Sequence, residues 1–381
     1  MDVIDKTSQE PANPLRSIRQ YLGRIIVGLI LVAMVYGAMT VVLPYRREKR
    51  IAEKIQSLGG KVEWGFTGPV WVHQFIRDRV PSLNRITSVD VNGKVVASDL
   101  LSDIGLLYKL ESLELANTKI TDAGLEQLKH LTNLKQLFLY NTQVTDAGLE
   151  RLKGLTSLTV LYLIQTQISD SGLEYLKGMT NLQQLMLGGT QVTDVGVEHL
   201  KSLTSLGFFD LDKTQVTDAS LNHLKEMTSL VRLNLSNTHV TDAGLEHLMG
   251  LTGLRWLELN DTQVTDIGAE HLKGLTSLIV LFLNRTQMTD TGLEHLVGLT
   301  SLSDLGLSST QITNAGLEHL NGLTNLNRLY LHDTQITDTG LEHLVGLTKL
   351  ILLYVNNTKA TEEGRARLRK ALPNCKIEPN P

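Results

Sequence analysis

Two apolar periodicities alternate along most of the chain. In residues 110–133, which read LESLELANTKITDAGLEQLKHLTN, leucines first alternate with polar residues and later recur at every third position. Alternation is the period of a strand that buries one face, and the later spacing indicates one apolar stripe of a helix. Thr121 and Asp122 precede that stripe, and either side-chain oxygen can accept from the free N–H groups of the first helical turn. Residues 110–133 therefore predict a strand, a turn and a helix.

The same 24-residue unit occurs eleven times, and its general form is L-x-x-L-x-L-x-x-T-x-[VI]-T-D-x-G-L-x-x-L-x-x-L-T-x. A divergent copy precedes the array at residues 86–109, with Ile86, Val89 and Val91 in its first apolar positions. One threonine recurs every 24 residues, at Thr118, Thr142, Thr166, Thr190, Thr214, Thr238, Thr262, Thr286, Thr310, Thr334 and Thr358. Because one unit cannot bury its apolar face alone, such units stack into a continuous core.

Stacking fixes the expected shape of the array. Each strand follows the previous one in the same direction, so the sheet is predicted to be parallel. Strands stack at about 4.8 Å whereas packed helices need about 8–10 Å, so the array should curve with its sheet on the inside. At the C-terminal end Arg365 takes a leucine position, residues 361–371 predict a charged helix, and residues 372–377 predict a last turn and an edge strand.

The pattern resembles the leucine-rich-repeat family, whose signature is L-x-x-L-x-L-x-x-N/C-x-L, over residues 86–377. Its T-D-x-G-L continuation is similar to the cysteine-containing repeats of F-box adaptors and to repeat arrays of bacterial membrane-anchored proteins. Threonine stands where the family has asparagine or cysteine, and its hydroxyl can still satisfy the backbone of the turn. The resemblance implies an α/β solenoid, a horseshoe with a parallel inner sheet and outer helices.

An apolar run without a charge extends from Ile25 to Leu43. Its 19 residues would span about 28 Å as a helix, close to the roughly 30 Å of a bilayer core, so we predict a transmembrane helix. A cleaved signal peptide is the alternative, although its apolar region would be shorter. Four basic residues precede the run and six follow it closely, which favours a cytoplasmic array. Ala33 and Gly37 form a small-residue pair that would allow weak homo-association.

The segment between the apolar run and the repeats predicts a small connector. Residues 46–58 predict a helix that ends at the Gly59-Gly60 pair, residues 61–66 a strand, and residues 69–80 a second helix. Its aromatic residues, Trp64, Phe66, Trp71 and Phe75, are expected to pack under the first repeat. The expected organisation is an N-terminal tail (1–24), a transmembrane helix (25–43), the connector (44–85), a capping repeat (86–109), eleven repeats (110–373) and a C-terminal cap strand and tail (374–381).

Charge and cysteine content narrow the possible functions. Residues 1–85 contain 13 Lys and Arg against 7 Asp and Glu, whereas the remainder contains 23 against 33. Because phosphate contacts need a basic surface, the acidic array is a poor nucleic-acid binder. The single cysteine, Cys375, excludes an intrachain disulfide and a thiolate-based metal site.

Recurring polar residues are expected to serve the fold rather than chemistry. One position of seven successive units is histidine, namely His199, His223, His247, His271, His295, His319 and His343. Each belongs to a different helix about 8–10 Å from the next, too far to share one zinc ion, so a solvated outer face is expected. Asp210 and Asp212 could help to hold Ca²⁺, and His332, Asp333 and Asp304 could form an acid–base set. No nucleophile or phosphate loop accompanies them, so we predict no cofactor, no metal and no enzymatic activity.

Functional residues are expected where the copies differ, at the third, fifth and seventh positions of the unit, which face the inside of the curve. An aromatic and apolar cluster is predicted on four adjacent strands from Phe138, Tyr140, Val160, Tyr162, Ile164, Met186 and Phe208. An acidic stretch beside it is predicted from Asp210, Asp212, Glu258 and Asp261, with Arg232 and Trp256 among them.

Exposed apolar patches usually mark partner sites, so the sequence predicts a membrane-anchored protein-binding scaffold. The partner would place apolar anchors on the cluster and basic groups near the acidic stretch. Ordinary variation of the inner face without one ligand is the alternative. A structural or self-associating envelope role, a ubiquitin-ligase-type adaptor and a hydrolase on the inner face are less favoured.

Overall fold

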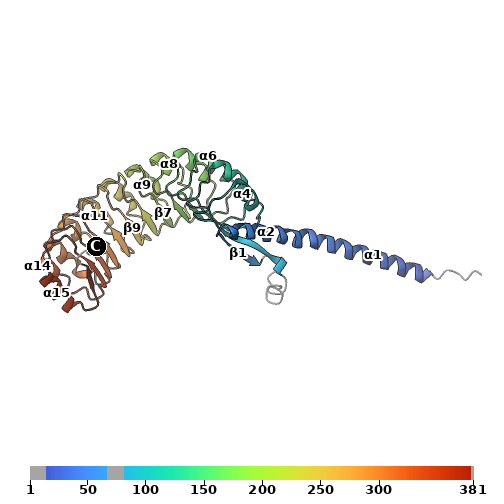
Figure 1. Cartoon of the computed structure of the whole chain (residues 1–381). Helices are drawn as coiled ribbons and strands as arrows, with labels where there is room; N and C mark the ends of the chain where they lie inside the picture. Colours follow the sequence, from blue (N-terminus) through green and yellow to red (C-terminus); the bar gives the residue numbers. More distant parts are fainter. Residues whose placement is uncertain (1–13, 67–80, 379–381) are drawn as a thin grey trace, which may run out of the picture.

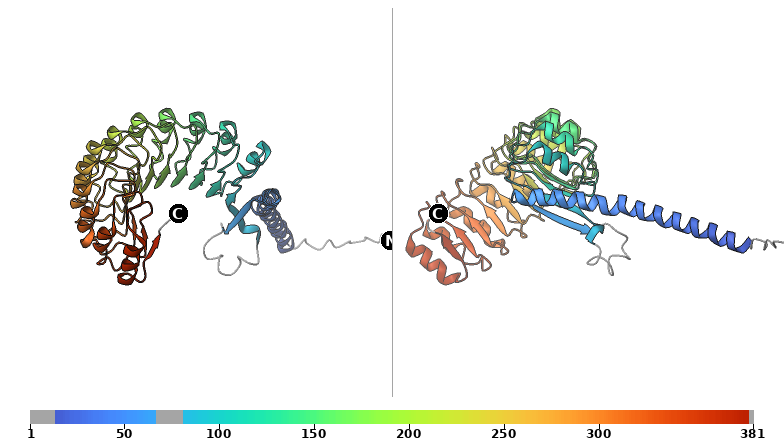
Figure 2. Two further views of the ribbon diagram at one scale, coloured as in Figure 1. Left: turned by 60° about the vertical axis from the view of Figure 1, so that its left-hand side comes forward. Right: turned by 45° about the vertical axis from the view of Figure 1, so that its right-hand side comes forward.

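The computed structural model describes residues 14–66 and 81–378. Within them the chain forms one curved solenoid with a long helix projecting from its N-terminal end (Figure 1). Fourteen strands form a single sheet in the order of the chain, β1 to β14. The sheet lines the inside of the curve and the helices lie outside it (Figure 2), which confirms the predicted architecture.

The strands of the repeats are three residues long and pair in parallel, in register, across the array. They are β2 (Asn84–Asp90), β3 (Ser112–Glu114), β4 (Gln136–Phe138), β5 (Val160–Tyr162), β6 (Gln184–Met186), β7 (Phe208–Asp210), β8 (Arg232–Asn234), β9 (Trp256–Glu258), β10 (Val280–Phe282), β11 (Asp304–Gly306), β12 (Arg328–Tyr330), β13 (Leu352–Tyr354) and β14 (Lys376–Glu378), of which β2 is longer. Identical spacing of the copies therefore places equivalent positions in rows that cross the sheet.

The outer helices are short, mostly one to two turns. They are α4 (Ser98–Ile104), α5 (Asp122–Leu125), α6 (Asp146–Leu152), α7 (Asp170–Leu173), α8 (Asp194–Glu198), α9 (Asp218–Leu224), α10 (Asp242–Leu245), α11 (Asp266–Leu272), α12 (Asp290–Glu294), α13 (Asn314–Leu317), α14 (Asp338–Glu342) and the longer α15 (Glu362–Ala371). Short 3-10 segments are η2 (Pro81–Leu83), η3 (Glu126–Leu128), η4 (Glu174–Leu176), η5 (Glu246–Leu248) and η6 (Glu318–Gly322). Leucines at every third position suit such segments, because a 3-10 helix has three residues per turn.

The recurring threonine holds the turn after each strand. The side chain of Thr238 is buried, and its Oγ1 donates to the carbonyl of Leu235 at 2.6 Å. The residue before it, Asn237, has a φ of 54°, and equivalent positions have a positive φ throughout the eleven repeats. After glycine, asparagine and aspartate tolerate this left-handed conformation best. The hydroxyl thus replaces the family's usual asparagine or cysteine at the turn.

The aspartate of the T-D-x-G-L segment links consecutive repeats. Asp242 accepts from the backbone N–H of Thr265 at 2.7 Å and from its hydroxyl at 2.6 Å. Thr265 in turn accepts from the N–H of Ile267 in the first turn of its own helix. In this and most other repeats the threonine is therefore the cap and the aspartate positions the next threonine, whereas Thr121, Ser169 and Thr337 make no such cap bond.

The N-terminal helix differs from the prediction in its length. Helix α1 (Pro14–Gly37), a π-helical segment η1 (Ala38–Val42) and α2 (Leu43–Ser57) follow one another without a break. The span that is long and apolar enough to cross a membrane lies within Arg24–Ser57, and its apolar window is not buried by the rest of the protein. The apolar helix and the connector helix, which the sequence predicted as separate elements, are therefore one continuous helix that passes through Pro44.

A buried arginine explains how the helix passes Pro44. Proline has no N–H to pair with the carbonyl of Thr40. Nη2 of Arg85 donates to that carbonyl at 3.1 Å and to the carbonyl of Val41 at 3.3 Å. The Arg85 side chain is almost fully buried, and its Nε lies 3.7 Å from the buried Glu48 carboxylate. The base of the long helix is thus fixed to the first strand of the array.

The connector also completes the sheet. Strand β1 (Lys61–Phe66) pairs with β2 in antiparallel orientation, with an irregularity between Glu63 and Trp64. Trp64 packs against the core and its ring lies 5.5 Å from that of Tyr45. The predicted helix at residues 69–80, with Trp71 and Phe75, lies outside the described residues. At the other end, Arg365 of α15 pairs with Glu362 in the polar C-terminal unit.

Candidate protein-binding face

The parallel register brings the variable positions together on the concave face. Phe138 pairs in register with Tyr162, Tyr162 with Met186, and Met186 with Asp210, so these fifth positions form one row across β4 to β7. Phe208 belongs to the neighbouring row of third positions. Within the described residues no helix covers this face (Figure 2).

The aromatic and apolar cluster is only partly as predicted. The rings of Phe138 and Tyr162 meet edge to face at 5.0 Å, and the Tyr162 hydroxyl donates to Gln184 at 2.8 Å. Partial burial raises the pKa of the Tyr162 phenol, so this hydroxyl stays protonated. Val160, however, is 8% exposed, so it offers little surface although its third position faces the inside of the curve. Tyr140, Ile164 and Met186 are half-buried, and Phe208 is 36% exposed.

The acidic stretch is largely neutralised within the chain. Asp212 pairs with Lys213 at 3.0 Å, and Asp261 with Arg285 through two nitrogen–oxygen contacts of 2.5 and 2.6 Å. The Asp210 carboxylate accepts only from the N–H of Asp212 among the bonds found in the described residues. Burial raises the pKa of the Asp210 carboxyl, with the carboxylates of Asp212 and Glu258 adding to the effect.

Arg232 and Trp256 form a fixed unit beside Asp210. The Arg232 guanidinium lies over the Trp256 indole at 4.3 Å. One oxygen of Glu258 accepts from both side chains, at 3.0 Å from Arg232 and 2.6 Å from Trp256. A cation–π contact and a shared carboxylate hold both groups in one orientation before any partner binds.

A second aromatic row, which the sequence analysis did not single out, continues from Trp256. Its ring meets Phe282 at 6.2 Å, Phe282 meets Tyr330 at 5.8 Å, and Tyr330 stacks on Tyr354 at 5.0 Å. Phe282 and Tyr330 touch across an intervening strand because Gly306 stands between them without a side chain; a Cβ there would lie 2.8 Å from Phe282. Phe282, Gly306 and Tyr330 all occupy the fifth position of their repeats. A glycine between two aromatic residues at that position was therefore the sequence signal for this contact.

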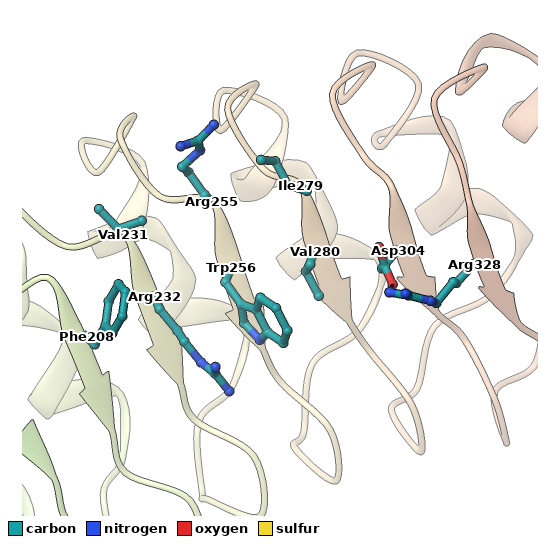
Figure 3. A pocket seen from close by; sticks show the side chains of 9 residues that line it. All are labelled: Phe208, Val231, Arg232, Arg255, Trp256, Ile279, Val280, Asp304 and Arg328. Atoms are coloured by element: carbon teal, nitrogen blue, oxygen red, sulfur yellow. Dashed lines mark hydrogen bonds and ion pairs between the residues drawn. The ribbon is translucent and has the colours of Figure 1, made fainter. Parts of the chain in front are cut away.

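The row of third positions surrounds a hollow of about 560 Å³ (Figure 3). Its floor is Val280, which is 5% exposed, and Asp304 and Arg328 border it through an ion pair of 2.7 Å. The lining consists of Phe208, Val231, Arg232, Arg255, Trp256, Ile279, Val280, Asp304 and Arg328. The lining contains three arginines and one aspartate, although the array as a whole is acidic.

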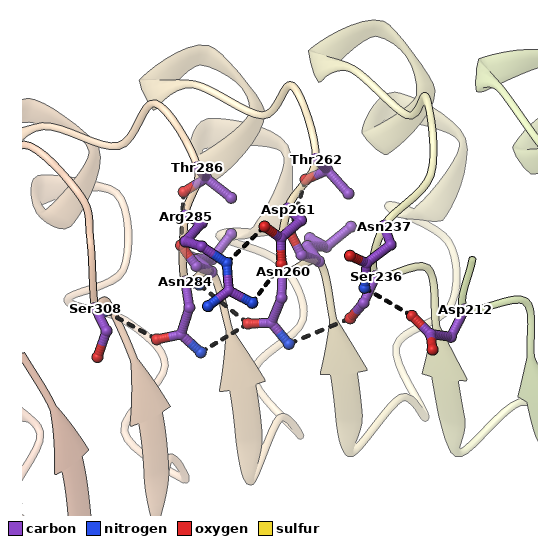
Figure 4. Close-up of polar contacts among 12 residues, drawn as sticks. Asp212, Ser236, Asn237, Asn260, Asp261, Thr262, Asn284, Arg285, Thr286 and Ser308 are labelled. Carbon is purple, nitrogen blue, oxygen red and sulfur yellow. Dashed lines mark hydrogen bonds and ion pairs between the residues drawn. The ribbon is translucent and has the colours of Figure 1, made fainter. Parts of the chain in front are cut away.

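A polar row borders the aromatic one at the seventh positions (Figure 4). Asn260 donates to the Ser236 hydroxyl at 3.2 Å and accepts from the Asn284 side chain at 2.7 Å. Asn284 accepts from the backbone N–H of Ser308 at 2.8 Å. These amides bond to one another and to the backbone, so this row serves the fold.

The residues considered for chemistry do not converge. The Ser308 hydroxyl lies 2.7 Å from Nδ1 of His332, whereas Asp304 bonds to Arg328 and Asp333 accepts from Asn357. The recurring histidines are half-buried instead of solvated, and two of them face the glutamate of the preceding repeat. Across residues 14–66 and 81–378, no group of three or more His, Cys, Asp and Glu side chains is arranged to hold a metal ion.

Comparisons with known proteins agree with this architecture. Family profiles for leucine-rich repeats match residues 108–151, 226–249 and 252–312. The comparison with curated proteins found no match.

Among solved structures, an internalin of Listeria monocytogenes is 25% identical with a TM-score of 0.60, covering 81% of this chain and 94% of that one. Internalin C2 of the same organism is 26% identical with a TM-score of 0.44, over 55% and 84%. A leucine-rich-repeat protein of Leptospira interrogans is 18% identical with a TM-score of 0.48, over 73% and 80%. The family profiles and the parallel inner sheet identify the repeats of this chain as leucine-rich repeats.

Proposed function

We propose that this chain is a membrane-anchored scaffold, without enzymatic activity, that binds a protein partner on its concave face. Leucine-rich-repeat proteins generally act as protein-binding scaffolds. The observation that carries the proposal is the uncovered inner sheet, on which Phe138, Tyr162 and Phe208 present aromatic surface within an acidic array. Aromatic side chains on a rigid surface are the usual anchors of protein interfaces.

The partner would lie across Phe138, Tyr140, Tyr162, Ile164, Met186 and Phe208, with Asp210, Asp212, Arg232, Trp256 and Glu258 at the border. Because Asp212, Asp261 and Glu258 already have cationic partners, Asp210 is the main acidic group that remains for a basic residue of the partner. The apolar cluster therefore contributes most of the expected affinity.

The anchor is supported by the exposed apolar helix and by its basic flanks. The four basic residues before residue 25 and the six after residue 43 favour an array on the cytoplasmic side. A cleaved signal sequence would share the apolar run, but here the helix continues into α2 and is fixed to Arg85. Mass spectrometry of the N-terminal peptide and extraction of membranes at alkaline pH distinguish an anchor from a removed leader.

Co-purification from the native cells tests partner binding. A full-length variant with Tyr162→Ala and Phe208→Ala is compared with a control that carries Glu246→Ala and Glu270→Ala on the outer face. The proposal expects a specific partner to be lost from the first variant and kept by the second. If both variants keep every partner of the wild-type protein, the concave cluster is not the binding surface.

A further inference from the structure

We infer that the hollow between β7 and β12 receives an extended segment of the partner, which carries an aromatic or branched apolar side chain close to a carboxylate. This inference rests on the proposed function and names the chemistry of what the concave face recognises. It concerns a different part of that face from the Phe138–Tyr162 pair.

The shape of the hollow selects an apolar side chain. Val280 forms the floor, Trp256 stands on one side, and the Asp304–Arg328 pair closes the other (Figure 3). Its volume of about 560 Å³ lies in the range of sites that enclose small organic groups. Because Glu258 fixes Trp256 and Arg232 in place, this wall is formed before the segment arrives, which reduces the ordering cost of binding.

The positive charge at the rim of the hollow favours an acidic residue next to the apolar one in the partner segment. Arg255 lies directly before β9, flanked at the rim by Val231 and Ile279, and it is exposed. Among the arginines of the described repeats, Arg151, Arg232, Arg285, Arg328, Arg365, Arg367 and Arg369 all make ion pairs, whereas no ion pair of Arg255 is found. A guanidinium at the edge of an apolar hollow is suited to a carboxylate, which it can hold through two hydrogen bonds.

The length of the site indicates an extended chain. The third-position row crosses six strands, from Phe208 on β7 to Arg328 on β12. At about 4.8 Å per strand step this is roughly 24 Å, the length of about seven residues in extended conformation.

Selection from a random peptide library tests this inference. A phage-displayed library of octapeptides is panned on the full-length protein in nanodiscs, with empty nanodiscs as the background. Enriched peptides are synthesised, and their affinities are measured by fluorescence anisotropy. The variants are Val280→Phe, which fills the hollow with a residue type that the same row holds at Phe208, and Arg255→Gln. Arg151→Gln on the outer face is the matched control.

The inference expects enriched peptides with an acidic residue beside an aromatic or branched one. Val280→Phe and Arg255→Gln should each weaken their binding at least about ten-fold, and Arg151→Gln should leave it unchanged. Peptides without an acidic residue, peptides that bind Val280→Phe as well as wild type, or no enrichment would each overturn it. Selected peptides that require Tyr162 but not Val280 would contradict the hollow while supporting the proposed function.

Discussion

At the scale of single residues, the recurring polar positions of the unit are connected from one repeat to the next. Gly268 is an example, because a Cβ at this position would clash with Oδ1 of Asp242. The same oxygen accepts a hydrogen bond from the backbone N–H of Thr265. In one repeat Ser220 replaces the glycine, and its hydroxyl and N–H both bond to Asp194. An alanine side chain should therefore fit this position less well than a serine side chain, whose hydroxyl can bond to the aspartate.

Replacing Gly268 tests this contact. Gly268→Ala should destabilise the array by about 1–3 kcal/mol, the usual cost of overpacking. Gly268→Ser should cost less although serine is larger, because its hydroxyl can donate to Asp242 as Ser220 does to Asp194. Gly274→Ala is the control, since a Cβ there meets nothing within 4 Å. Chemical denaturation measures all three, and equal losses for alanine and serine would contradict the account.

Asp210 gives a pH-dependent prediction. Burial raises the pKa of its carboxyl, so the charged form destabilises the folded state at neutral pH. Asp210→Asn should therefore raise the melting temperature at pH 7, as Asn234 shows that the amide fits the same position of the next repeat. As pH falls through the raised pKa, the wild-type carboxyl takes up a proton. The difference in melting temperature between Asp210→Asn and the wild-type protein should therefore shrink. An advantage that grows on acidification would contradict the assignment.

At the scale of elements, the two periodicities predicted the strand, the turn, the helix and the parallel sheet. They could not predict contacts that depend on distant parts of the chain. The apolar helix and the connector helix were predicted as separate elements, because the bonds of Arg85 to the carbonyls of Thr40 and Val41 cannot be read from the sequence. The pairing of β1 with β2 is a long-range feature of the same kind, whereas the contact of Phe282 with Tyr330 had a sequence signal in Gly306 between them.

The joint between the long helix and the array depends on the Arg85–Glu48 pair. Arg85→Met leaves the buried Glu48 carboxylate without its ion-pair partner and should cost about 3–5 kcal/mol in the N-terminal unit. The double variant Glu48→Gln, Arg85→Met should be less destabilised than Arg85→Met alone. Hydrogen–deuterium exchange of residues 43–57 measures both. Unchanged protection of α2 in Arg85→Met would show that the pair does not fix the helix.

At the scale of the whole molecule, the fixed joint would hold the concave face at one orientation to the membrane. The side of the membrane is tested by labelling an introduced thiol, Asn321→Cys, on the exposed outer surface. Burial raises the pKa of the native Cys375 to about 11, so it should not compete for the reagent. We expect a membrane-impermeant maleimide to label Asn321→Cys only after the cells are opened. Equal labelling of intact cells would place the array outside.

Partner binding on the concave face is the central claim, and site-specific photo-crosslinking tests it most directly. A photoreactive residue replaces Tyr162 in the full-length protein in its native cells, and a control carries it at Glu246 on the outer face. The account predicts a crosslinked protein that is specific to position 162. Identical products at both positions, or no product at position 162, would contradict recognition by this surface.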